Sequence, residues 1–480
     1  MGVSPTILWF RLDLRLADNP ALQAALRRGG PILPVFVWAP EEEGGWAPGG
    51  ASRWWLHQSL RSLANSLENL GSRLILRRGP TCETLVAVAR ETRADAVVWN
   101  RRYEPALVRR DTEVKARLKA AGLTVESYNS ALLCEPWTLA TRVGKPYQVF
   151  TPFWKACQAS ASPPPPAPAP RRLPAPVKWP PSLELAELKL EPTIDWAGGL
   201  RSSWQPGERG AQALLDRFLR AALADYRNER DRPDRMGTSR LSPHLHFGEI
   251  GPGQIWHALR EAARDAGAQR EAAAEWYLRE LGWREFAHHL LFHFPHTTDE
   301  PLRQEFTRFP WRSDAKALRA WQRGRTGYPL VDAGMRELWH TGWMHNRVRM
   351  VVASFLVKHL LIPWQEGAAW FWDTLVDADL ANNSLGWQWT AGCGADAAPF
   401  FRIFNPVSQG SKFDEQGEYV RRWVPELARV PAQWIHQPWA APPQVLAEAE
   451  VKLGVTYPLP IVEHAEARKR ALEALSEVSR

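Results

Sequence analysis

The sequence has little cysteine. Its 480 residues include 4 cysteines, and no two of them have the C-x-x-C spacing of a metal or redox motif. Cysteines scattered in this way argue against a disulfide framework and against a zinc site. We therefore expect no bound metal and a reducing, cytoplasmic environment. The four are Cys82, Cys134, Cys157 and Cys393.

Long apolar runs are missing as well. The valine- and leucine-rich stretch 351–362 is interrupted by Ser354, Lys358 and His359, so it predicts a buried helix and no membrane span. The first residues do not combine a charged start with an apolar run, which predicts no secretory leader. No internal repeat is evident. These absences favour a globular protein without a membrane partner.

Positive charge and tryptophan are abundant. The formal net charge is +8 and the sequence pI is about 9.4, which suits a phosphate-backbone partner such as DNA. The alternative is that a basic composition reflects only the codon usage of a GC-rich genome. The 26 tryptophans indicate rings used as stacking platforms or electron carriers, although many will be core residues.

The N-terminal part alternates between short apolar runs and helix-periodic stretches. The apolar runs predict strands starting at Thr6 and covering residues 32–38, 73–76, 96–99 and 123–128, with helices between them such as 52–70 and 109–121. Such alternation predicts a doubly wound parallel sheet. No G-x-G-x-x-G follows the first strand, so a dinucleotide at its end is unsupported, although the carboxyl edge could hold another ligand.

Two changes in composition divide the chain. Prolines crowd residues 160–192, which predicts an irregular, partly polyproline connector over the surface. From residue 208 onward nearly every segment has helical periodicity. We therefore expect an α/β domain at 1–135, a linker at 136–207 and an all-α domain at 208–480. Its predicted helices cover 211–226, 255–266, 271–293, 314–322, 335–338, 347–360 and 368–373.

The stretch 375–390, L-V-D-A-D-L-A-N-N-S-L-G-W-Q-W-T, concentrates polar and aromatic groups. Its polar residues are Asp377, Asp379, Asn382 and Asn383. They are followed closely by two tryptophans, a combination that suits a large polar and aromatic ligand. The alternative is a loop of capping residues between two helices, because Asp and Asn favour helix N-termini and turns.

Two upstream stretches offer similar chemistry. In T-G-W-M-H-N-R-V-R-M, residues 341–350, Asn346 and Met350 lie four apart and share a helix face. In E-L-G-W-R-E-F, residues 280–286, the same rule groups Glu280, Trp283 and Arg284. Three helical stretches thus present carboxylate, amide or guanidinium groups beside aromatic surface.

These motifs resemble those of the cryptochrome/photolyase family, and within it the DNA photolyases. T-S-R-L-S-P-H-L at 238–245 and T-G-Y-P-L-V-D-A-G-M-R at 326–336 occur with the stretches above in family order. The resemblance implies non-covalent, U-shaped FAD in the helical part, with T-S-R-L-S seating its pyrophosphate at the start of a helix. The implied FAD contacts are Tyr226, Thr238, Ser239, Arg240, Leu241, Ser242, Tyr277, Glu280, Arg284, Asn346, Arg349, Asp377, Asp379 and Asn383.

The resemblance also implies light-driven repair of cyclobutane pyrimidine dimers in ultraviolet-damaged DNA. The lesion is flipped out of the duplex, and the reduced FAD passes it an electron after excitation. The implied lesion contacts are Glu280, Trp283, Asn346, Met350 and Trp389. Asn346 and Met350 stand where enzymes for the (6-4) photoproduct have histidines, which favours the cyclobutane dimer. Candidate phosphate contacts are Arg232, Arg402 and Lys412, although scattered surface cations are the plainer interpretation.

Two accessory functions follow from the same resemblance. Trp387, Trp364 and Trp311 match the family's electron relay to the flavin, although each could be a packing ring. An antenna pigment is expected in the α/β domain, either 5,10-methenyltetrahydrofolate, which we favour, or 8-hydroxy-5-deazaflavin. Candidate antenna contacts, for which a solvated loop is the plainer interpretation, are Asn100, Arg101, Arg102 and Glu104.

Two other functions stay open. A cryptochrome-type blue-light photoreceptor would share the fold without turnover, and a light-independent DNA-binding protein would use the basic surface alone. Asn383, matching the position near flavin N5 where plant cryptochromes resemble Asp, favours repair, as does the expected lack of a long tail after Arg480. We expect a monomer with no obligate protein partner.

Overall fold

The computed structural model describes residues 3–264, 267–397 and 402–478. Positions 266 and 480, which entered the sequence predictions, lie outside these ranges. Contacts divide the chain into unit 1, residues 1–147, 151–224 and 239–295, and unit 2, residues 148–150, 225–238 and 296–480. Unit 1 includes helices that the sequence prediction placed in a domain starting at residue 208, and the predicted domain limits stay a prediction. We describe each unit by itself.

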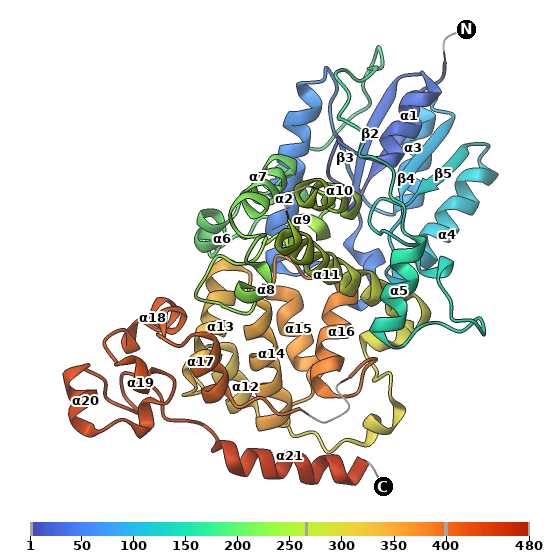
Figure 1. Ribbon diagram of the computed structural model, residues 1–480. Coiled ribbons are helices and arrows are strands. Elements are labelled where there is room, and N and C mark those ends of the chain that lie inside the picture. The colour runs from blue at the N-terminus through green and yellow to red at the C-terminus, as the bar shows by residue number, and fades with distance from the viewer. Residues whose placement is uncertain (1–2, 265–266, 398–401, 479–480) are drawn as a thin grey trace. The chain divides into compact units, whose positions relative to one another are not determined.

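Unit 1 contains a five-stranded sheet in which every pairing is parallel (Figure 1). The strand order is β3-β2-β1-β4-β5, so the doubly wound topology is confirmed and the order reverses between β1 and β4. One prediction was displaced: the third strand begins two residues later than expected, because its pairing with β2 runs from Val35 with Ile75 to Trp38 with Arg78. The strands are β1 (Thr6–Phe10), β2 (Ile32–Trp38), β3 (Ile75–Arg78), β4 (Ala96–Asn100) and β5 (Thr124–Tyr128).

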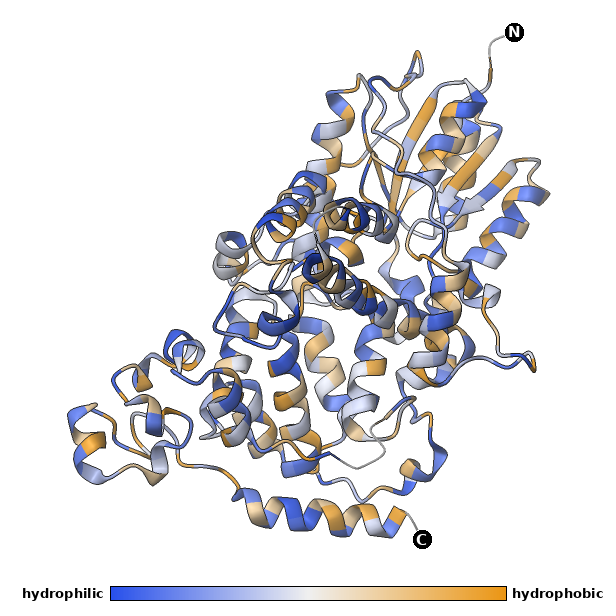
Figure 2. Ribbon diagram, viewed as in Figure 1, coloured by the Kyte–Doolittle hydropathy of each residue, from blue (hydrophilic) through white to orange (hydrophobic). Residues whose placement is uncertain are grey.

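Strands β1, β2 and β4 are buried at every position, as both faces of a doubly wound sheet require. Helix α1 (Pro20–Arg28) packs against β1 and β4, whereas α3 (Thr81–Thr92) and α4 (Pro105–Ala120) supply Leu85, Val88 and Leu118 to a core that includes strand side chains Trp9 and Trp99. Figure 2 shows these strands as largely hydrophobic. The sheet is therefore a rigid platform whose polar chemistry is confined to the strand ends.

The proline-rich segment runs irregularly along unit 1 and covers the β3 edge of the sheet. Leu183 N–H donates to the Leu76 carbonyl at 3.0 Å, and Leu76 N–H donates to Ser182 Oγ at 2.9 Å. Ile32 N–H donates to the Pro174 carbonyl at 2.8 Å. Unpaired strand edges invite aggregation, so this segment protects the sheet as well as connecting elements.

Unit 1 also contains helices outside the sheet region. Among them, α9 begins within the T-S-R-L-S-P-H-L motif and α11 carries the E-L-G-W-R-E-F motif. The predicted helix 211–226 is shorter than expected, because the N–H groups of Ala222 and Leu223 both bond to the Phe218 carbonyl and end it. These helices are α2 (Gly50–Glu68), α5 (Phe150–Ser160), whose first residue falls in unit 2, α6 (Gly198–Ser203), α7 (Glu208–Ala221), α9 (Ser242–His246), α10 (Pro252–Ala263) and α11 (Ala268–His293).

All described strands lie within residues 6–128, so the described part of unit 2 is helical, as predicted. The expected helix 347–360 is α14 followed by a π-helical turn at Phe355–His359. No described helix is both long enough and apolar enough to cross a membrane. The helices of unit 2 are α8 (Tyr226–Glu229), α12 (Ala315–Gln322), α13 (Pro329–Thr341), α14 (Asn346–Ser354), α15 (Trp364–Thr374), α16 (Leu380–Ala391), α17 (Pro406–Phe413), α18 (Glu418–Trp423), α19 (Ala432–Ile435), α20 (Pro443–Glu448) and α21 (His464–Val478).

The motif T-G-Y-P-L-V-D, residues 326–332, has a structural explanation. Buried Asp332 accepts hydrogen bonds from the N–H and hydroxyl of Thr326, both at 2.7 Å, and from Gly327 N–H at 3.1 Å. The Tyr457 hydroxyl donates to the same carboxylate at 2.7 Å. Asp332 therefore fixes the start of α13 and connects it to the C-terminal part of unit 2.

Candidate functional site

In unit 1, α11 carries four predicted site residues, Tyr277, Glu280, Trp283 and Arg284. Tyr277 is buried and the other three are half-buried. The Arg284 Nη1 donates to the carbonyl of Ala131 at 2.5 Å, so this guanidinium is already tied to the loop after β5. The expected common helix is confirmed, and the packing leaves Glu280 and Trp283 partly accessible.

The T-S-R-L-S segment is anchored to α11 by a hydroxyl pair. Ser239 Oγ and the Tyr277 hydroxyl lie 2.7 Å apart, and Leu241 N–H donates to Ser239 Oγ at 3.3 Å. Burial raises the pKa of Tyr277 to about 12, so it stays a neutral donor. Arg240 has a left-handed φ of 56° and stacks its guanidinium 4.3 Å from the Trp204 ring centroid.

The helix expected after this segment exists but is short. Helix α9 begins at Ser242 and has 5 residues, so its dipole is small. The role of T-S-R-L-S in seating the pyrophosphate stays a prediction. Within α9, His244 Nδ1 hydrogen-bonds the buried carboxylate of Glu249, which also accepts from Ser59 Oγ at 2.6 Å. This buried network holds the end of the motif against α2.

In unit 2, two of the implied FAD contacts, Arg349 and Asp377, form an ion pair. Arg349 Nη2 donates to Asp377 Oδ2 at 2.8 Å and to Oδ1 at 3.0 Å, while Nε donates to the Met344 carbonyl at 2.8 Å. The Asp377 side chain is 4% exposed and that of Arg349 is 24% exposed. The pair is therefore largely desolvated and fixed in direction, which suits a charge that faces a flavin ring.

Helix α14 starts at Asn346, one of the implied site residues, because His345 caps the helix. His345 Nδ1 accepts from Arg347 N–H at 3.2 Å, and burial lowers the pKa of His345 to about 4, so the imidazole is a neutral acceptor at physiological pH. Asn346 is exposed, Met350 is half-buried one turn later, and both lie on α14 as expected. Sequence analysis did not identify the cap, since histidine is an uncommon N-cap residue.

Asp379 caps α16 in the same way. It accepts from Asn382 N–H at 2.9 Å and from Asn382 Nδ2 at 2.7 Å, so the capping interpretation of this stretch is confirmed for Asp379. Asn383 Nδ2 donates to the Ala368 carbonyl at 3.1 Å. Among the described residues, Oδ1 of Asn383 has no partner, which leaves one acceptor for a ligand such as a reduced flavin.

Three tryptophans of the predicted relay occupy connected segments of unit 2. Trp387 packs directly on α15, since a Cβ added to Gly367 would lie 2.1 Å from its ring. Trp364 is the first residue of α15, and the N–H of Arg312, next to Trp311, donates to the Leu361 carbonyl at 2.7 Å. Trp387 and Trp364 are buried, whereas Trp311 is half-buried. Two buried rings and one half-buried ring thus occupy these segments, and their role as a relay stays a prediction.

The remaining flavin and lesion candidates are placed on stable elements. Tyr226, buried at the start of α8, lies under the Arg230 guanidinium at 5.5 Å. Trp389 is half-buried on α16, two residues after Trp387, and Thr238 is half-buried. Trp283 belongs to unit 1 and Trp389 to unit 2, and their joint contact with a lesion stays a prediction.

The three candidate phosphate contacts differ in how free they are. Arg232 is engaged by Asp234, at 3.0 Å from Nε and 2.7 Å from Nη2, and this pair raises its pKa. Arg402 and Lys412 are exposed and lie over the rings of Phe404 and Phe413 at 5.6 and 5.2 Å. Arg402 and Lys412 are therefore the better phosphate candidates.

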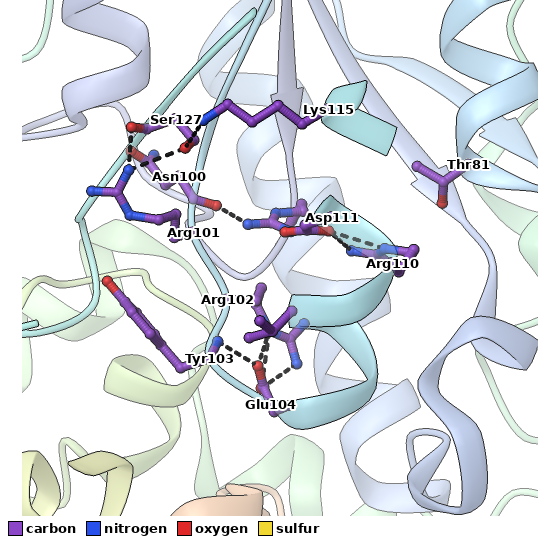
Figure 3. A network of polar contacts seen from close by, with 12 residues as sticks. Thr81, Asn100, Arg101, Arg102, Tyr103, Glu104, Arg110, Asp111, Lys115 and Ser127 are labelled. Carbon is purple, nitrogen blue, oxygen red and sulfur yellow. Dashed lines mark hydrogen bonds and ion pairs between the residues drawn. The ribbon is translucent and has the colours of Figure 1, made fainter. Parts of the chain in front are cut away.

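Figure 3 shows the antenna candidates at the carboxyl end of β4, Asn100, Arg101, Arg102 and Glu104, among their polar contacts. Asn100 donates to Asp13 at 2.6 Å and to Asn19 at 2.8 Å, and it accepts from Ala21 N–H at 3.2 Å. Arg11 adds a contact to the Asn100 carbonyl. We call Arg11, Asp13, Asn19 and Asn100 the sheet-edge network. Asn100 is 3% exposed, so its assignment to a solvated loop was wrong.

The next three polar residues are engaged as well. Arg101 donates to Glu135 at 2.7 Å and 3.1 Å, while Arg102 Nε donates to Glu104 at 2.9 Å. Burial, opposed by the neighbouring Arg102, raises the pKa of Glu43 beside this pair. Among the described residues no group of His, Cys, Asp and Glu has the geometry of a metal site.

Known proteins resemble this chain over its full length. Residues 6–171 match the description "DNA photolyase" and residues 276–477 match "FAD binding domain of DNA photolyase". A deoxyribodipyrimidine photo-lyase of Agrobacterium fabrum is 51% identical over 100% of this chain and 99% of the relative. Cryptochrome-2 of Arabidopsis thaliana is 44% identical over 98% of this chain and 78% of the relative. The crystal structure of a bacterial class III photolyase from Agrobacterium tumefaciens superimposes with a TM-score of 0.96 at 51% identity, covering 100% and 98% of the two chains.

The parallel sheet and the helical FAD-binding part together define a two-part flavoprotein. The chain belongs to the cryptochrome/photolyase family. FAD is therefore its cofactor. Each unit by itself offers groups that fit FAD: an arginine–aspartate pair and an amide with a free acceptor in unit 2, and a serine–tyrosine hydroxyl pair in unit 1.

Proposed function

We propose that the protein is a deoxyribodipyrimidine photo-lyase that repairs cyclobutane pyrimidine dimers in DNA under blue light. The observation that carries this proposal is the packing of α14 against α16 in unit 2, which combines the Arg349–Asp377 pair with Asn346, Met350 and Trp389. The Agrobacterium relatives are named as photolyases, and their similarity over the full chain supports repair over a photoreceptor role. FAD held by these residues would, when reduced and excited by light, supply the electron that splits the dimer and would then regain it.

The chain's own residues hold the reaction partners. Arg349, fixed by Asp377, presents a positive charge that stabilises negative charge on the flavin ring, and Asn383 offers Oδ1 as an acceptor. Ser239 and Tyr277 support the pyrophosphate segment. The predicted FAD contacts from Tyr226 to Asn383 belong to this proposal.

The lesion is recognised by rings and by two polar side chains. Trp283 and Trp389 offer half-buried indole faces for stacking against a flipped dimer, while Glu280 and Asn346 offer hydrogen bonds to its thymines. Met350 supplies apolar surface beside Asn346. Arg402 and Lys412 contribute exposed charge to the DNA backbone, with Arg232 weakened by Asp234.

The relay and the antenna complete the proposal. Trp311, Trp364 and Trp387 pass electrons inward to oxidised FAD, from the half-buried Trp311 to the two buried tryptophans. The antenna pigment is 5,10-methenyltetrahydrofolate, with 8-hydroxy-5-deazaflavin as the alternative that mass analysis of extracted cofactors would distinguish. We propose a cytoplasmic monomer.

The test uses the holoprotein, chemically reduced, with an oligonucleotide that contains one thymine dimer. Blue light should restore the two thymines and darkness should not, as measured by chromatography. Glu280→Ala should lower repair about tenfold while FAD stays bound, because one hydrogen bond to the lesion is lost. The control is Glu275→Ala, a matching substitution on the same helix. Full FAD retention without any light-dependent repair by the unmodified protein would favour a photoreceptor.

A further inference from the structure

Two cysteines of unit 1 lie in contact although 22 residues separate them in the sequence. The sulfur atoms of Cys134 and Cys157 are 3.2 Å apart, and both are free thiols. Cys134 is half-buried in the loop after β5, whereas Cys157 is 0% exposed on α5. Cys134 is therefore the more exposed of the two residues and its partner lies directly against it, an arrangement that the sequence spacing did not reveal.

The loop that carries Cys134 is fastened to α11. Glu285 Oε2 accepts from the N–H groups of Leu133 at 2.8 Å and Cys134 at 3.0 Å. Arg284 donates to the carbonyl of Ala131 at 2.5 Å. Two successive residues of α11 thus hold three residues of the loop, Ala131, Leu133 and Cys134, which fixes the backbone that carries the Cys134 sulfur.

The helix that carries Cys157 packs on the same turn of α11. A Cβ added to Gly282 would lie 2.5 Å from Trp154 Cε3, so Trp154 of α5 fits directly against this glycine. Cys157 follows Trp154 by three residues and lies on the same side of α5. The thiol pair therefore closes a ring of contacts around residues 282–285 of α11.

We propose that Cys134 and Cys157 form a reversible disulfide when the protein meets hydrogen peroxide. The Cys134 thiolate attacks one peroxide oxygen, the O–O bond breaks, and the other oxygen leaves as hydroxide and takes up a proton. The Cys157 sulfur then attacks the resulting sulfenic sulfur, and the hydroxyl group leaves as water with the Cys157 proton. Two thiols lose two electrons and two protons, and one peroxide becomes two water molecules.

The surroundings assign these roles. The S–H of Cys157 donates to the Cys134 sulfur, and this hydrogen bond, together with burial, raises the pKa of Cys157. Cys157 therefore keeps its proton until Cys134 has been oxidised, and it then resolves the sulfenic acid. The two sulfur atoms, 3.2 Å apart, need to approach each other by about 1.2 Å to reach the disulfide bond length of about 2.0 Å.

The crosslink reinforces the part of α11 that carries Trp283 and Arg284. It joins the loop and α5 on either side of residues 282–285, so opening this turn then requires both elements to move together. Oxidation should stabilise unit 1 without displacing Arg284 from Ala131. The pair acts as an oxidant-driven clamp, and this role is independent of the proposed repair function.

The direct test treats the full-length holoprotein with hydrogen peroxide, alkylates the remaining thiols and maps peptides by mass spectrometry. We expect a Cys134–Cys157 crosslinked peptide, loss of two alkylation sites, free Cys82 and Cys393, and full recovery after reduction with dithiothreitol. Cys134 found as a sulfinic acid, or both thiols still alkylated after oxidation, would overturn the proposal. The unmodified chain suffices for this experiment.

Variants provide a second readout. Cys157→Ser should abolish the crosslink and leave Cys134 open to further oxidation, whereas the control Cys82→Ser should form the crosslink normally. Oxidation should raise the melting temperature of the unmodified protein by about 5 °C and leave that of Cys157→Ser unchanged. Equal melting temperatures of the oxidised and reduced unmodified protein would contradict the clamp.

Discussion

The sheet-edge network of unit 1 and the Arg349–Asp377 region of unit 2 are both clusters of polar groups beside aromatic rings. They differ in how completely the protein uses their hydrogen-bonding capacity. Asn100 is saturated by Asp13, Asn19 and Ala21, whereas Asn383 makes one hydrogen bond and keeps an acceptor free. A polar network whose hydrogen bonds are all made within the protein stabilises the fold, whereas a network with an unused donor or acceptor can bind a ligand. This contrast distinguishes structural from functional polar residues better than residue type does.

The largest expected effect is a loss of stability caused by a substitution in the sheet-edge network. Asn100→Ala leaves Asp13, Asn19 and the Ala21 N–H without their partner in the interior, which should lower the free energy of unfolding by about 3 kcal/mol. FAD content of the folded protein should stay unchanged. Chemical unfolding and flavin absorbance measure the two quantities.

The control for Asn100→Ala is Asp95→Ala, which removes a pair with Arg28 that is 50% exposed on the aspartate side. Its cost should be below about 1 kcal/mol. If Asn100→Ala were as mild as this control, or if it lost FAD at full stability, the assignment of the sheet-edge network to structure would be wrong.

The substitution Asp377→Asn tests whether the Arg349–Asp377 region of unit 2 binds FAD. Arg349 then loses a charge-assisted partner in a desolvated position, so FAD affinity should fall about 10- to 100-fold. Equilibrium dialysis of FAD measures this change. Asp373→Asn, on an exposed position of α15, is the control and should bind FAD normally. Unchanged FAD affinity in Asp377→Asn would remove Asp377 from the flavin contacts.

Glu285 tests whether a buried carboxylate beside the site is structural. Burial raises its pKa to about 7, so the native state holds a proton that the unfolded chain has released above about pH 4.5. The native state binds more protons in this window, and stability therefore falls as the pH rises from about 4.5 to 7, by about 2 kcal/mol.

Glu285→Gln should lack this pH slope. The amide oxygen can still accept from Leu133 and Cys134, so the variant should match the unmodified protein near pH 4.5 and exceed its stability above pH 7. Unfolding free energies at several pH values provide the comparison. Parallel pH profiles for the two proteins would show that Glu285 does not titrate as its burial predicts.

The smallest expected effect is at the surface end of the relay. Trp311→Phe should slow photoreduction of oxidised FAD about tenfold, because phenylalanine is a poorer electron donor, while repair by pre-reduced protein should stay within about twofold. Flash absorption and the repair assay separate these quantities. Trp276→Phe, 37% exposed in unit 1, is the control. Loss of repair by the pre-reduced variant would contradict the relay assignment.

Much of the fold follows from local sequence. Strand β2 was predicted at its observed bounds, since its apolar run coincides with its burial. The motif resemblance named both Arg349 and Asp377, and the structure pairs them. The third strand was displaced because pairing with β2, and not hydropathy, sets where it ends at Arg78. Helical periodicity could not reveal the π-helical turn around Lys358.

The features that the sequence did not predict depend on contacts between segments that are distant in the chain. Asn100 was a candidate ligand contact in the sequence, but its partners Asp13 and Asn19 lie at the end of another strand and at a helix cap. Cys134 and Cys157 were dismissed for their spacing, and only packing around α11 brings them together. Sequence patterns identify elements, whereas the saturation of a polar group is a tertiary property.

The central claim is that the FAD bound by this chain passes an electron to a dimer and regains it in each cycle. The most direct measurement counts repaired dimers per protein molecule in blue light, with pre-reduced holoprotein, excess dimer-containing DNA and no added reductant. We predict many dimers repaired per protein, with none in the dark. Repair that stops at or below one dimer per protein, with FAD still bound, would contradict catalytic return of the electron.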